Sequence, residues 1–474
     1  MEERDVVHTS SVAVLVVLAG LCLQSIALAE QRVFHVAPDG DDSGPATAER
    51  PWASVDKAAA EARAGDTVVL RGGTYMLKAP LRLTGAGQED AWITIKGAQG
   101  ETPVLDAGSI QTADGRGRLS TRGAVQVDGA TYLRLKNLHV RESYGAGFAV
   151  TGRNTQHIEL IGCSSDHSYA PGFWLYQSQD LRVIGCEVTR SNDLRMAGEG
   201  ATGRREAPHE ALSIAGVQGF EVAYCRVHRG YKEAIDCKEN SAHGKIHHNE
   251  CYDMPRQGLY VDAWFGTLED VELYENTVHD CEFGVAVAVE GRGANMRNVS
   301  IHNNVIYRNR ASGIFLAMWG TDGPRENIRI YNNTVCNNGR AGHWSGSVGG
   351  IDVRSADIKS VLIANNISVG NFAYDRATFA APEGRQQALA EKGIVIAGNM
   401  TGPFQEQETV AGQFPRPYPF RGEQTVEGDP RFVLPRAADF RLLPGSPAIG
   451  AAVRIEGVPY SPDIGAFQTS APAG

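Results

Sequence analysis

Three features are scarce in this sequence, and their scarcity limits the class of protein that it can encode. Its 474 residues carry a formal net charge of −10, so it lacks the basic excess of a nucleic-acid surface and we expect no nucleic-acid partner. Aromatic residues make up only 8% of the chain while glycines number 54, a balance that favours many turns over a large aromatic core. After residue 29 no run approaches the roughly 20 apolar residues that span a bilayer, which excludes a multispan membrane protein.

The cysteines also lack the spacing of a metal site. No Cys-x-x-Cys pair occurs, so a structural zinc site is not expected. Of the eight cysteines, Cys22 lies in the apolar start of the chain, and seven remain. Cys163, Cys186 and Cys225 share one position of a repeat. We interpret them as buried, reduced thiols that pack as small hydrophobes, with a disulfide between neighbours as the alternative.

The first 29 residues predict a secretory signal peptide. An apolar run over residues 12–23 ends at the small-x-small site Ala27-Leu28-Ala29. The acidic opening, with Glu2 and Glu3, is atypical of such a segment, and a membrane anchor is the alternative. We therefore expect a secreted or periplasmic protein that has no membrane contact once the signal is cleaved.

A repeated phrase runs down the middle of the chain. It reads apolar-x-apolar-x-x-(Asn/Cys), and most steps between its last positions are 23 to 33 residues. Self-similarity at that period indicates a solenoid, and the β-branched, alternating residues of the unit predict coils of short strands. The repeated position is filled by Asn137, Cys163, Cys186, Cys225, Asn249, Asn276, Asn304, Asn333, Asn366 and Asn399.

The repeat divides the chain into four predicted parts. After the signal peptide, residues 30–110 form an N-terminal cap with the first coils, 111–400 the solenoid with its groove, and 401–474 an irregular C-terminal cap. Within the first cap, residues 51–65 predict a short helix with Ser54 as N-cap, which would cover the open end of the solenoid.

One step of the repeat is much longer than the others. The distance from Cys186 to Cys225 predicts an inserted loop over residues 190–208. Long loops on a rigid solenoid are usually functional. Arg195, Arg204 and Arg205 in this loop are candidates for binding an anionic substrate, with an ordinary solvated loop as the alternative.

Several phrases together resemble one group of proteins. They are Val36-Ala-Pro-Asp-Gly-Asp-Asp, residues 64–75, the repeated Asn, Gly445-Ser-Pro-Ala and Asp463-Ile-Gly-Ala-Phe. With them the chain resembles exported right-handed parallel β-helix proteins of the polysaccharide-lyase and glycoside-hydrolase type. The resemblance implies an all-β, single-domain right-handed parallel β-helix with a capping helix, a monomeric state and a polysaccharide substrate. It does not choose an activity, because the fold hosts lyases, hydrolases, epimerases and adhesins.

A second strand in each predicted coil presents an unusual outer face. Its alternate residues point outward in columns, and charges gather on three adjacent coils, flanked by aromatic residues. Clustered acids beside aromatic rings favour a groove for a sugar chain, with a surface packed under the loops as the alternative. The expected substrate-binding residues are Trp174, Tyr176, Trp264, Phe315, Trp319 and Arg354.

Three acids in this face are candidates for a metal site. Glu210 and Glu233 are expected to stack about 5 Å apart, with Asp236 nearby. Carboxylates that close need a cation or a shared proton, and Ca²⁺ prefers such oxygen ligands. The alternatives are an acid/base pair or salt bridges with Lys232 or Lys238.

The segment from Glu233 to Lys238 resembles a phrase of the chondroitinase B and alginate lyase family. The resemblance implies Glu233 as a calcium ligand and Lys238 as the base. That family's arginine on the following coil has no counterpart here, since Tyr260 and Asp262 stand there. A partial likeness to calcium-dependent pectate lyases also exists, with their lysine replaced by Tyr260.

The favoured function is β-elimination on a uronic-acid polymer. Lys238 or Tyr260 would take the C5 proton, and His209, directly before Glu210, could reach the groove. Glycoside hydrolysis is the main alternative, with Asp236 and Asp262 as the paired carboxylates and Glu290 as a substitute for either. A C5-epimerase and a non-catalytic carbohydrate-binding surface protein complete the alternatives.

Overall fold

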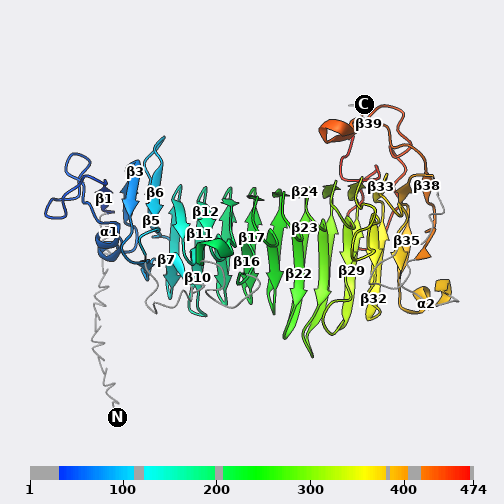
Figure 1. The fold of residues 1–474 in the computed structure, drawn as a ribbon, viewed down its shortest axis with the longest axis horizontal. Coiled ribbons are helices and arrows are strands. Elements are labelled where there is room, and N and C mark those ends of the chain that lie inside the picture. Colours follow the sequence, from blue (N-terminus) through cyan, green and yellow to red (C-terminus); the bar gives the residue numbers. More distant parts are fainter. Residues whose placement is uncertain (1–30, 111–121, 198–206, 380–384, 404–417, 470–474) are drawn as a thin grey trace, which may run out of the picture. The chain divides into compact units, whose positions relative to one another are not determined.

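The computed structural model describes residues 31–110, 122–197, 207–379, 385–403 and 418–469. The predicted signal peptide, Arg204 and Arg205 lie outside these residues. The strands of residues 32–469 follow one another as a row of coils (Figure 1). In the part of the chain that is described, no helix is long and apolar enough to cross a membrane.

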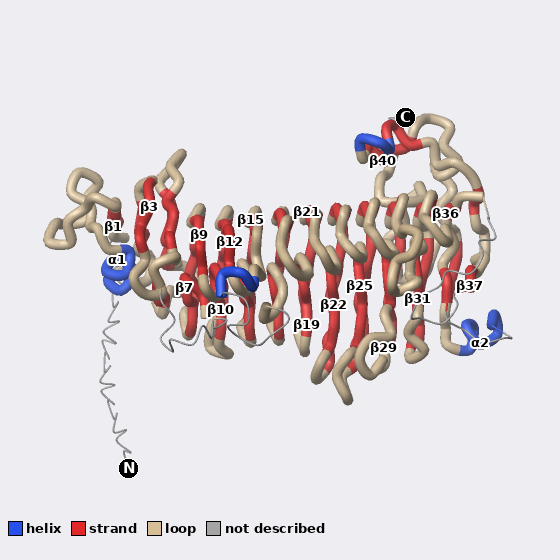
Figure 2. Tube along the Cα trace, viewed as in Figure 1, coloured by secondary structure: helices blue, strands red, loops and turns tan. Residues whose placement is uncertain are grey.

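Three parallel sheets form the coils, and each regular coil contributes one strand to sheet A, then B, then C (Figure 2). Sheet A comprises β1 (Val33–Val36), β2 (Thr67–Leu70), β5 (Ile93–Gly97), β8 (Thr131–Lys136), β11 (Gln156–Ile161), β14 (Gln179–Ile184), β17 (Gln218–Ala223), β20 (Ala242–His247), β23 (Thr267–Tyr274), β26 (Asn295–His302), β29 (Arg325–Tyr331), β32 (Ile358–Ala364) and β35 (Val395–Ala397). Sheet B comprises β3 (Gly73–Met76), β6 (Pro103–Asp106), β9 (His139–Ser143), β12 (Ser164–Ser168), β15 (Glu187–Thr189), β18 (Arg226–His228), β21 (Glu250–Tyr252), β24 (Thr277–His279), β27 (Val305–Tyr307), β30 (Thr334–Cys336), β33 (Ile367–Val369), β36 (Met400–Thr401) and β38 (Val426–Glu427). Sheet C comprises β4 (Leu81–Leu83), β7 (Gly123–Asp128), β10 (Ala146–Thr151), β13 (Phe173–Tyr176), β16 (Leu212–Ala215), β19 (Ile235–Lys238), β22 (Leu259–Ala263), β25 (Val285–Val289), β28 (Ile314–Leu316), β31 (Ile351–Val353), β34 (Thr378–Phe379) and β37 (Tyr418–Pro419), the last pairing antiparallel.

The predicted parallel β-helix is confirmed, and so is the register of its outer columns. On sheet C, Asp236 pairs with Tyr260 and Lys238 with Asp262 in the next coil. Because side chains alternate between the two faces of a strand, this register fixes which residues of neighbouring coils stack. The charged residues are therefore neighbours, as the alternation predicts.

The repeated Asn/Cys position is a continuous buried column at the turn between sheets A and B. From Asn249 to Asn399 each side-chain amide donates to the carboxamide oxygen of the next asparagine, for example Asn276 to Asn304 at 2.9 Å. The prediction that Asn137 belongs to this column is wrong. Strand β8 pairs with β11 before this turn, and β9 pairs with β12 after it. That register places Cys163 on Leu138, the residue after Asn137. Asn137 is instead the turn residue, with φ of 51°.

The seven described cysteines are all free and buried, which confirms the interpretation as packed thiols. Cys163, Cys186 and Cys225 fill the upstream part of the column, where their sulfurs lie 3.3–3.7 Å from backbone carbonyls. A second amide column, not predicted from the sequence, runs beside it through Asn309, Asn338 and Asn371.

Short elements lie at the two ends of the coils. The predicted capping helix is α1 (Val55–Glu61), and Ser54 is its N-cap residue with extended backbone. Its hydroxyl donates to Asp42, however, and makes no hydrogen bond to the helix. Near the C-terminus lie α2 (Arg385–Glu391), a 3₁₀ turn η2 (Pro435–Ala437) and the antiparallel pair β39 (Phe432–Leu434) and β40 (Asp439–Leu442). There Phe440 packs against Tyr307 of sheet B.

Candidate active-site cleft on sheet C

A cleft of about 570 Å³ lies over strands β19 and β22 of sheet C. A larger cavity, about 700 Å³, lies near the C-terminal end of the coils, but the clustered charges are in the sheet C cleft. The cleft is lined by Glu210, Lys232, Glu233, Lys238, Glu239, Arg256, Gln257, Tyr260, Asp262, Trp264, Glu282, Phe283, Glu290, Trp319 and Trp344. The structure thus brings together most of the acids, Lys238, Tyr260 and two of the tryptophans named from the sequence.

Strand β19 shows how the sequence positions these groups. Ile235 and Cys237 point into the solenoid and are fully buried in its core. Asp236 and Lys238 alternate with them and point outward, yet they are 1% and 7% exposed because neighbouring side chains cover them. Burial of outward-facing charges sets this part of the sheet apart from an ordinary solvated surface.

An ammonium lies among the carboxylates. Lys238 donates a hydrogen bond to Glu210, and its Nζ is 3.2 Å from Oδ2 of Asp236. Burial alone would lower the pKa of Lys238, but Glu210, Asp236 and Asp262 hold it well above the ordinary value. Lys238 therefore stays positively charged at neutral pH.

Glu210 is the anion of this group. Burial would raise its pKa, but the ammonium groups of Lys238 and Lys232 overcome that effect and hold the pKa well below the ordinary value. Lys232 lies 3.3 Å from the other carboxylate oxygen, Oε1. Glu210 is thus ionised and held by two cations.

Asp236 and Asp262 have pKa values shifted in the opposite direction. Burial, followed by the charge of Asp262, raises the pKa of Asp236 well above its ordinary value. Burial likewise raises the pKa of Asp262, against the lowering effect of Lys238. Both oxygens of Asp236 and Oδ1 of Asp262 are buried without a hydrogen-bond partner. Asp236 does not line the cleft, so it acts on Lys238 rather than on a ligand.

Arg256 is a cleft cation that the sequence did not single out. Its guanidinium donates to Glu233 at 2.8 Å. Lys232 also approaches the other oxygen of Glu233, at 3.8 Å. Arg256 lies in the turn before β22, where no strand alternation marks a residue as facing the groove.

Tyr260 and Glu290 form a hydrogen-bonded pair that lines the cleft. The Tyr260 hydroxyl donates to Oε1 of Glu290, which follows β25 in the next coil. Burial raises the pKa of Glu290 above its ordinary value. Burial and the negative charges of Asp262 and Glu290 raise the pKa of Tyr260 well above its own ordinary value. Glu290 is partly exposed and both side chains line the cleft, so both can meet a ligand.

Three tryptophans line the same cleft. Trp264 is 49% exposed and its indole N–H donates to Asp262 at 2.7 Å. Trp319 packs edge-on against Tyr260. Trp344, which the sequence did not single out, is 47% exposed and donates to Glu282 at 2.7 Å. It comes from the long turn after β30, where residue spacing gives no column.

Other predicted residues lie elsewhere or are covered. Phe315 is fully buried against Phe283 and Trp319, so it supports the wall of the cleft and does not present a face to a sugar. Arg354 is 2% exposed and bonded to Asp352 at 2.5 Å, beneath the turn that contains Gly346. It is a structural ion pair rather than part of the cleft lining.

Trp174, Tyr176 and His209 form a separate stack upstream of the cleft. The ring of His209 lies 3.8 Å from that of Trp174, which stacks in turn on Tyr176 at 5.2 Å. Trp174 is 5% exposed because His209 covers it. None of the three lines the cleft, although His209 directly precedes Glu210.

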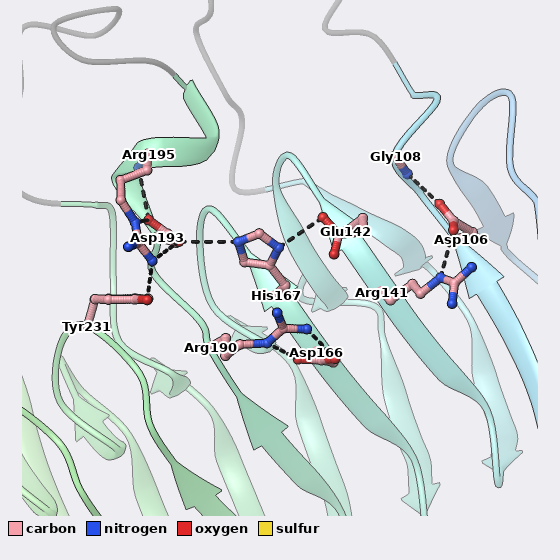
Figure 3. Close-up of polar contacts among 10 residues, drawn as sticks. All are labelled: Asp106, Gly108, Arg141, Glu142, Asp166, His167, Arg190, Asp193, Arg195 and Tyr231. Carbon is pink, nitrogen blue, oxygen red and sulfur yellow. Dashed lines mark hydrogen bonds and ion pairs between the residues drawn. The ribbon is translucent and has the colours of Figure 1, made fainter.

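The described base of the inserted loop is held by a polar chain, seen in Figure 3. His167 bridges Glu142 and Asp193, at 2.9 and 3.2 Å. Asp193 also accepts three hydrogen bonds from Arg195, one from its backbone N–H and two from its guanidinium, which packs over Tyr231. Arg195 is therefore an anchor of the short turn η1 (Leu194–Ala197), away from the cleft lining.

The predicted calcium ligands are already paired with cations of the chain. Glu210 receives Lys238 and Lys232, and Glu233 receives Arg256. Asp236 keeps unpaired oxygens, but the ammonium of Lys238 lies beside one of them. Among the residues that the structure describes, no three His, Cys, Asp or Glu side chains are arranged to hold a metal ion. The arrangement does not fit calcium.

Comparison with known proteins agrees with the fold. Residues 34–252 match the family model described as a Pel9A-like, right handed beta helix region. A solved structure of pectate lyase Pel9A matches 92% of this chain and 96% of its own, with a TM-score of 0.53 and 15% identity. The resemblance to right-handed β-helix carbohydrate-active proteins is thereby confirmed, including the predicted handedness.

Two curated relatives match parts of the chain. The uncharacterized protein YwoF of Bacillus subtilis (strain 168) is 24% identical over 312 residues, which cover 59% of this chain and 63% of YwoF. Pectate lyase PEL9 of Emericella nidulans is 27% identical over 175 residues, 36% of this chain and 42% of that enzyme. The chain thus aligns with less than two thirds of the length of either relative.

Proposed function

We propose that this protein is an exported polysaccharide lyase that cleaves a uronic-acid-containing chain by β-elimination. The likeness of residues 34–252 to the Pel9A-type β-helix and the pectate lyase relative both support a lyase. One observation carries the proposal. A single cleft holds cations that can neutralise a uronate, Lys238 and Arg256, beside a pair that can move protons, Glu290 and Tyr260.

The cations would act first. The C5 proton of a uronate is removed more readily once its carboxylate is neutralised, because the charge that develops next to it is then stabilised. Lys238 is held in its charged form by three carboxylates, so we assign it to this electrostatic role and not to the role of base. Arg256 lines the same cleft and can pair with a planar carboxylate.

Glu290 would be the base and Tyr260 the acid. The Glu290 carboxylate, whose pKa is raised by burial, takes the C5 proton, and the C5–H electrons form the C4–C5 double bond. The C4–O bond breaks and the Tyr260 hydroxyl protonates the leaving oxygen. The hydrogen bond between the two side chains then returns the proton from Glu290 to the Tyr260 phenolate, which restores both groups.

The tryptophans would hold the sugar rings. Trp264, Trp319 and Trp344 give the cleft flat apolar faces among its charges, a combination suited to an anionic polysaccharide. A substrate of this kind is met outside the cytoplasm, in keeping with the signal peptide proposed for residues 1–29.

The test is to incubate the purified protein with uronate polymers and with neutral polysaccharides. Ultraviolet absorbance of unsaturated uronates and new reducing ends are followed together. A lyase raises both signals. If reducing ends appear without the absorbance, β-elimination is ruled out for that substrate.

Glu290→Gln and Tyr260→Phe separate the two chemical roles. Each should lower the rate by about 10²–10⁴-fold, the usual contribution of a positioned acid or base. Glu272→Gln, an exposed acid on sheet A, is the matched control and should retain the wild-type rate. Equal activity of Glu290→Gln and wild type would remove Glu290 from the mechanism.

Glycoside hydrolysis is the second candidate. It is favoured by one observation, the raised pKa values of the neighbouring carboxyl groups Asp262 and Glu290. A carboxyl group kept protonated at neutral pH can serve as the general acid of a glycosidase. In that case reducing ends alone increase, and Asp262→Asn abolishes activity.

A further inference from the structure

Lys238 occupies the point where the cleft carboxylates approach one another. Its Nζ bonds to Oε2 of Glu210 and lies 3.2 Å from Oδ2 of Asp236. The β19–β22 register sets Asp262 beside it in the next coil. The side chain is 9% exposed, so solvent screens these charges little.

A divalent cation would need the same oxygens. Calcium takes six to eight oxygen ligands at about 2.3–2.6 Å. Glu210, Asp236 and Asp262 are the buried carboxylates around Lys238, and the nearby Glu233 is paired with Arg256. The ammonium group of Lys238 already pairs with one oxygen of Glu210 and one oxygen of Asp236. A metal ion would have to displace Lys238 and would meet its charge at close range.

We propose that Lys238 is a built-in replacement for a metal ion, so that the cleft holds an anionic sugar with the chain's own cations. The meaning of this for catalysis rests on the proposed lyase function, but the claim about cation binding does not. It predicts that the native cleft takes no calcium and that removal of the ammonium creates a calcium site.

The test compares wild type, Lys238→Met and Lys238→Arg for binding of Ca²⁺ and of Tb³⁺ as its luminescent substitute. Methionine keeps much of the side-chain volume without the charge, and arginine keeps the charge. Trp264 is bonded to Asp262, so its indole can sensitise a Tb³⁺ ion bound among these carboxylates. Lys245→Met, an exposed lysine on sheet A, controls for loss of a lysine elsewhere.

Only Lys238→Met should gain a site. Millimolar Ca²⁺ should raise its melting temperature by about 2–4 °C and should quench its sensitised Tb³⁺ signal by competition. Wild type, Lys238→Arg and Lys245→Met should show neither effect. Adding Asp236→Asn to Lys238→Met should abolish the gain, which locates the new site.

Three results would overturn the inference. One is a calcium-induced shift in wild type that Asp236→Asn removes. Another is a Lys238→Met variant that folds and gains no calcium binding. The third is a Lys238→Met variant that fails to fold with or without calcium, because the freed carboxylates would then have bound no ion. Loss of lyase activity bears only on the proposed function, since each readout here is independent of turnover.

Discussion

Two buried polar arrangements cross the coils of this solenoid, and they are built in opposite ways. In the asparagine column each amide is bonded to the next, as from Asn276 to Asn304 to Asn333. In the charged cluster of sheet C, which lies around Lys238, Asp236 and Asp262 are buried with oxygens that have no hydrogen-bond partner. The asparagine column satisfies its polar groups by hydrogen bonds, whereas the charged cluster leaves several oxygens with only neighbouring charges.

The difference separates what stabilises the fold from what the cleft can do. Buried polar groups are nearly always paired, so unpaired ones mark positions where stability has been given up. The asparagine column repeats one solution in coil after coil. The charged cluster of the cleft lies on the coils from β16 to β25, where pKa values are shifted in both directions.

The largest effect is expected from breaking the asparagine column at Asn304. Its amide donates to Leu273 and Asn333 and its carbonyl accepts from Asn276, so alanine leaves several buried groups unpaired. Asn304→Ala should lower the free energy of unfolding by about 2–4 kcal/mol. Urea denaturation measures the change. The exposed Asn298→Ala serves as control, and an equal loss there would show that burial does not matter.

A smaller effect of opposite sign is expected at Asp236. The substitution Asp236→Asn removes a buried carboxylate without changing its shape, and should raise the free energy of unfolding by about 1 kcal/mol at pH 8. Urea denaturation at pH 8 measures it. A destabilised Asp236→Asn would mean that the ionised carboxylate is needed to balance Lys238.

The pH dependence of the free energy of unfolding, compared between wild type and Asp236→Asn, shows the direction of this pKa shift. Burial and Asp262 raise the folded-state pKa of Asp236 above its ordinary value of 3.8, so the folded protein binds the proton more tightly than the unfolded chain. The resulting stabilisation is complete below about pH 3.8 and is lost as pH rises through the folded pKa. Wild-type stability should therefore fall more steeply with rising pH than that of Asp236→Asn, and parallel profiles would contradict the shift.

The smallest effect is expected where the column changes from cysteine to asparagine. The backbone N–H of Cys225 donates to the side-chain carbonyl of Asn249, and its sulfur makes only long contacts with Val183 and Ala223. Cys225→Asn extends the amide column by one coil. We expect a gain of about 0.5 kcal/mol or less, since a net hydrogen bond is partly offset by polar burial. A loss above 1 kcal/mol would show that the cysteine part is packed for sulfur.

The sequence foretells positions that lie on strands. Alternation and the repeat fix Asp236 and Lys238 as outward neighbours of Tyr260 and Asp262, because register is set by the buried face. Prediction from the sequence fails where the conformation of a turn determines the position of a residue. Asn137 fits the repeated phrase but lies outside the column, because asparagine also suits the left-handed turn one position earlier.

The rest of the site depends on how turns fold over the sheet. Arg256 and Trp344 reach the cleft from turns whose length varies between coils, so no periodic pattern marks them. The way segments fold over the sheet also explains why some predicted residues do not line the cleft. Phe315 and Arg354 do point outward from their strands, but neighbouring segments cover them, and alternation cannot show what covers a face.

The coil architecture makes the length of the molecule independent of its chemistry. Each coil pairs only with the coil before and the coil after it, as the strand order of the three sheets shows. The charged groups span neighbouring coils, from Glu210 to Glu290. Whole coils gained or lost upstream during evolution would therefore change the length of the outer surface without disturbing the charged groups of the cleft.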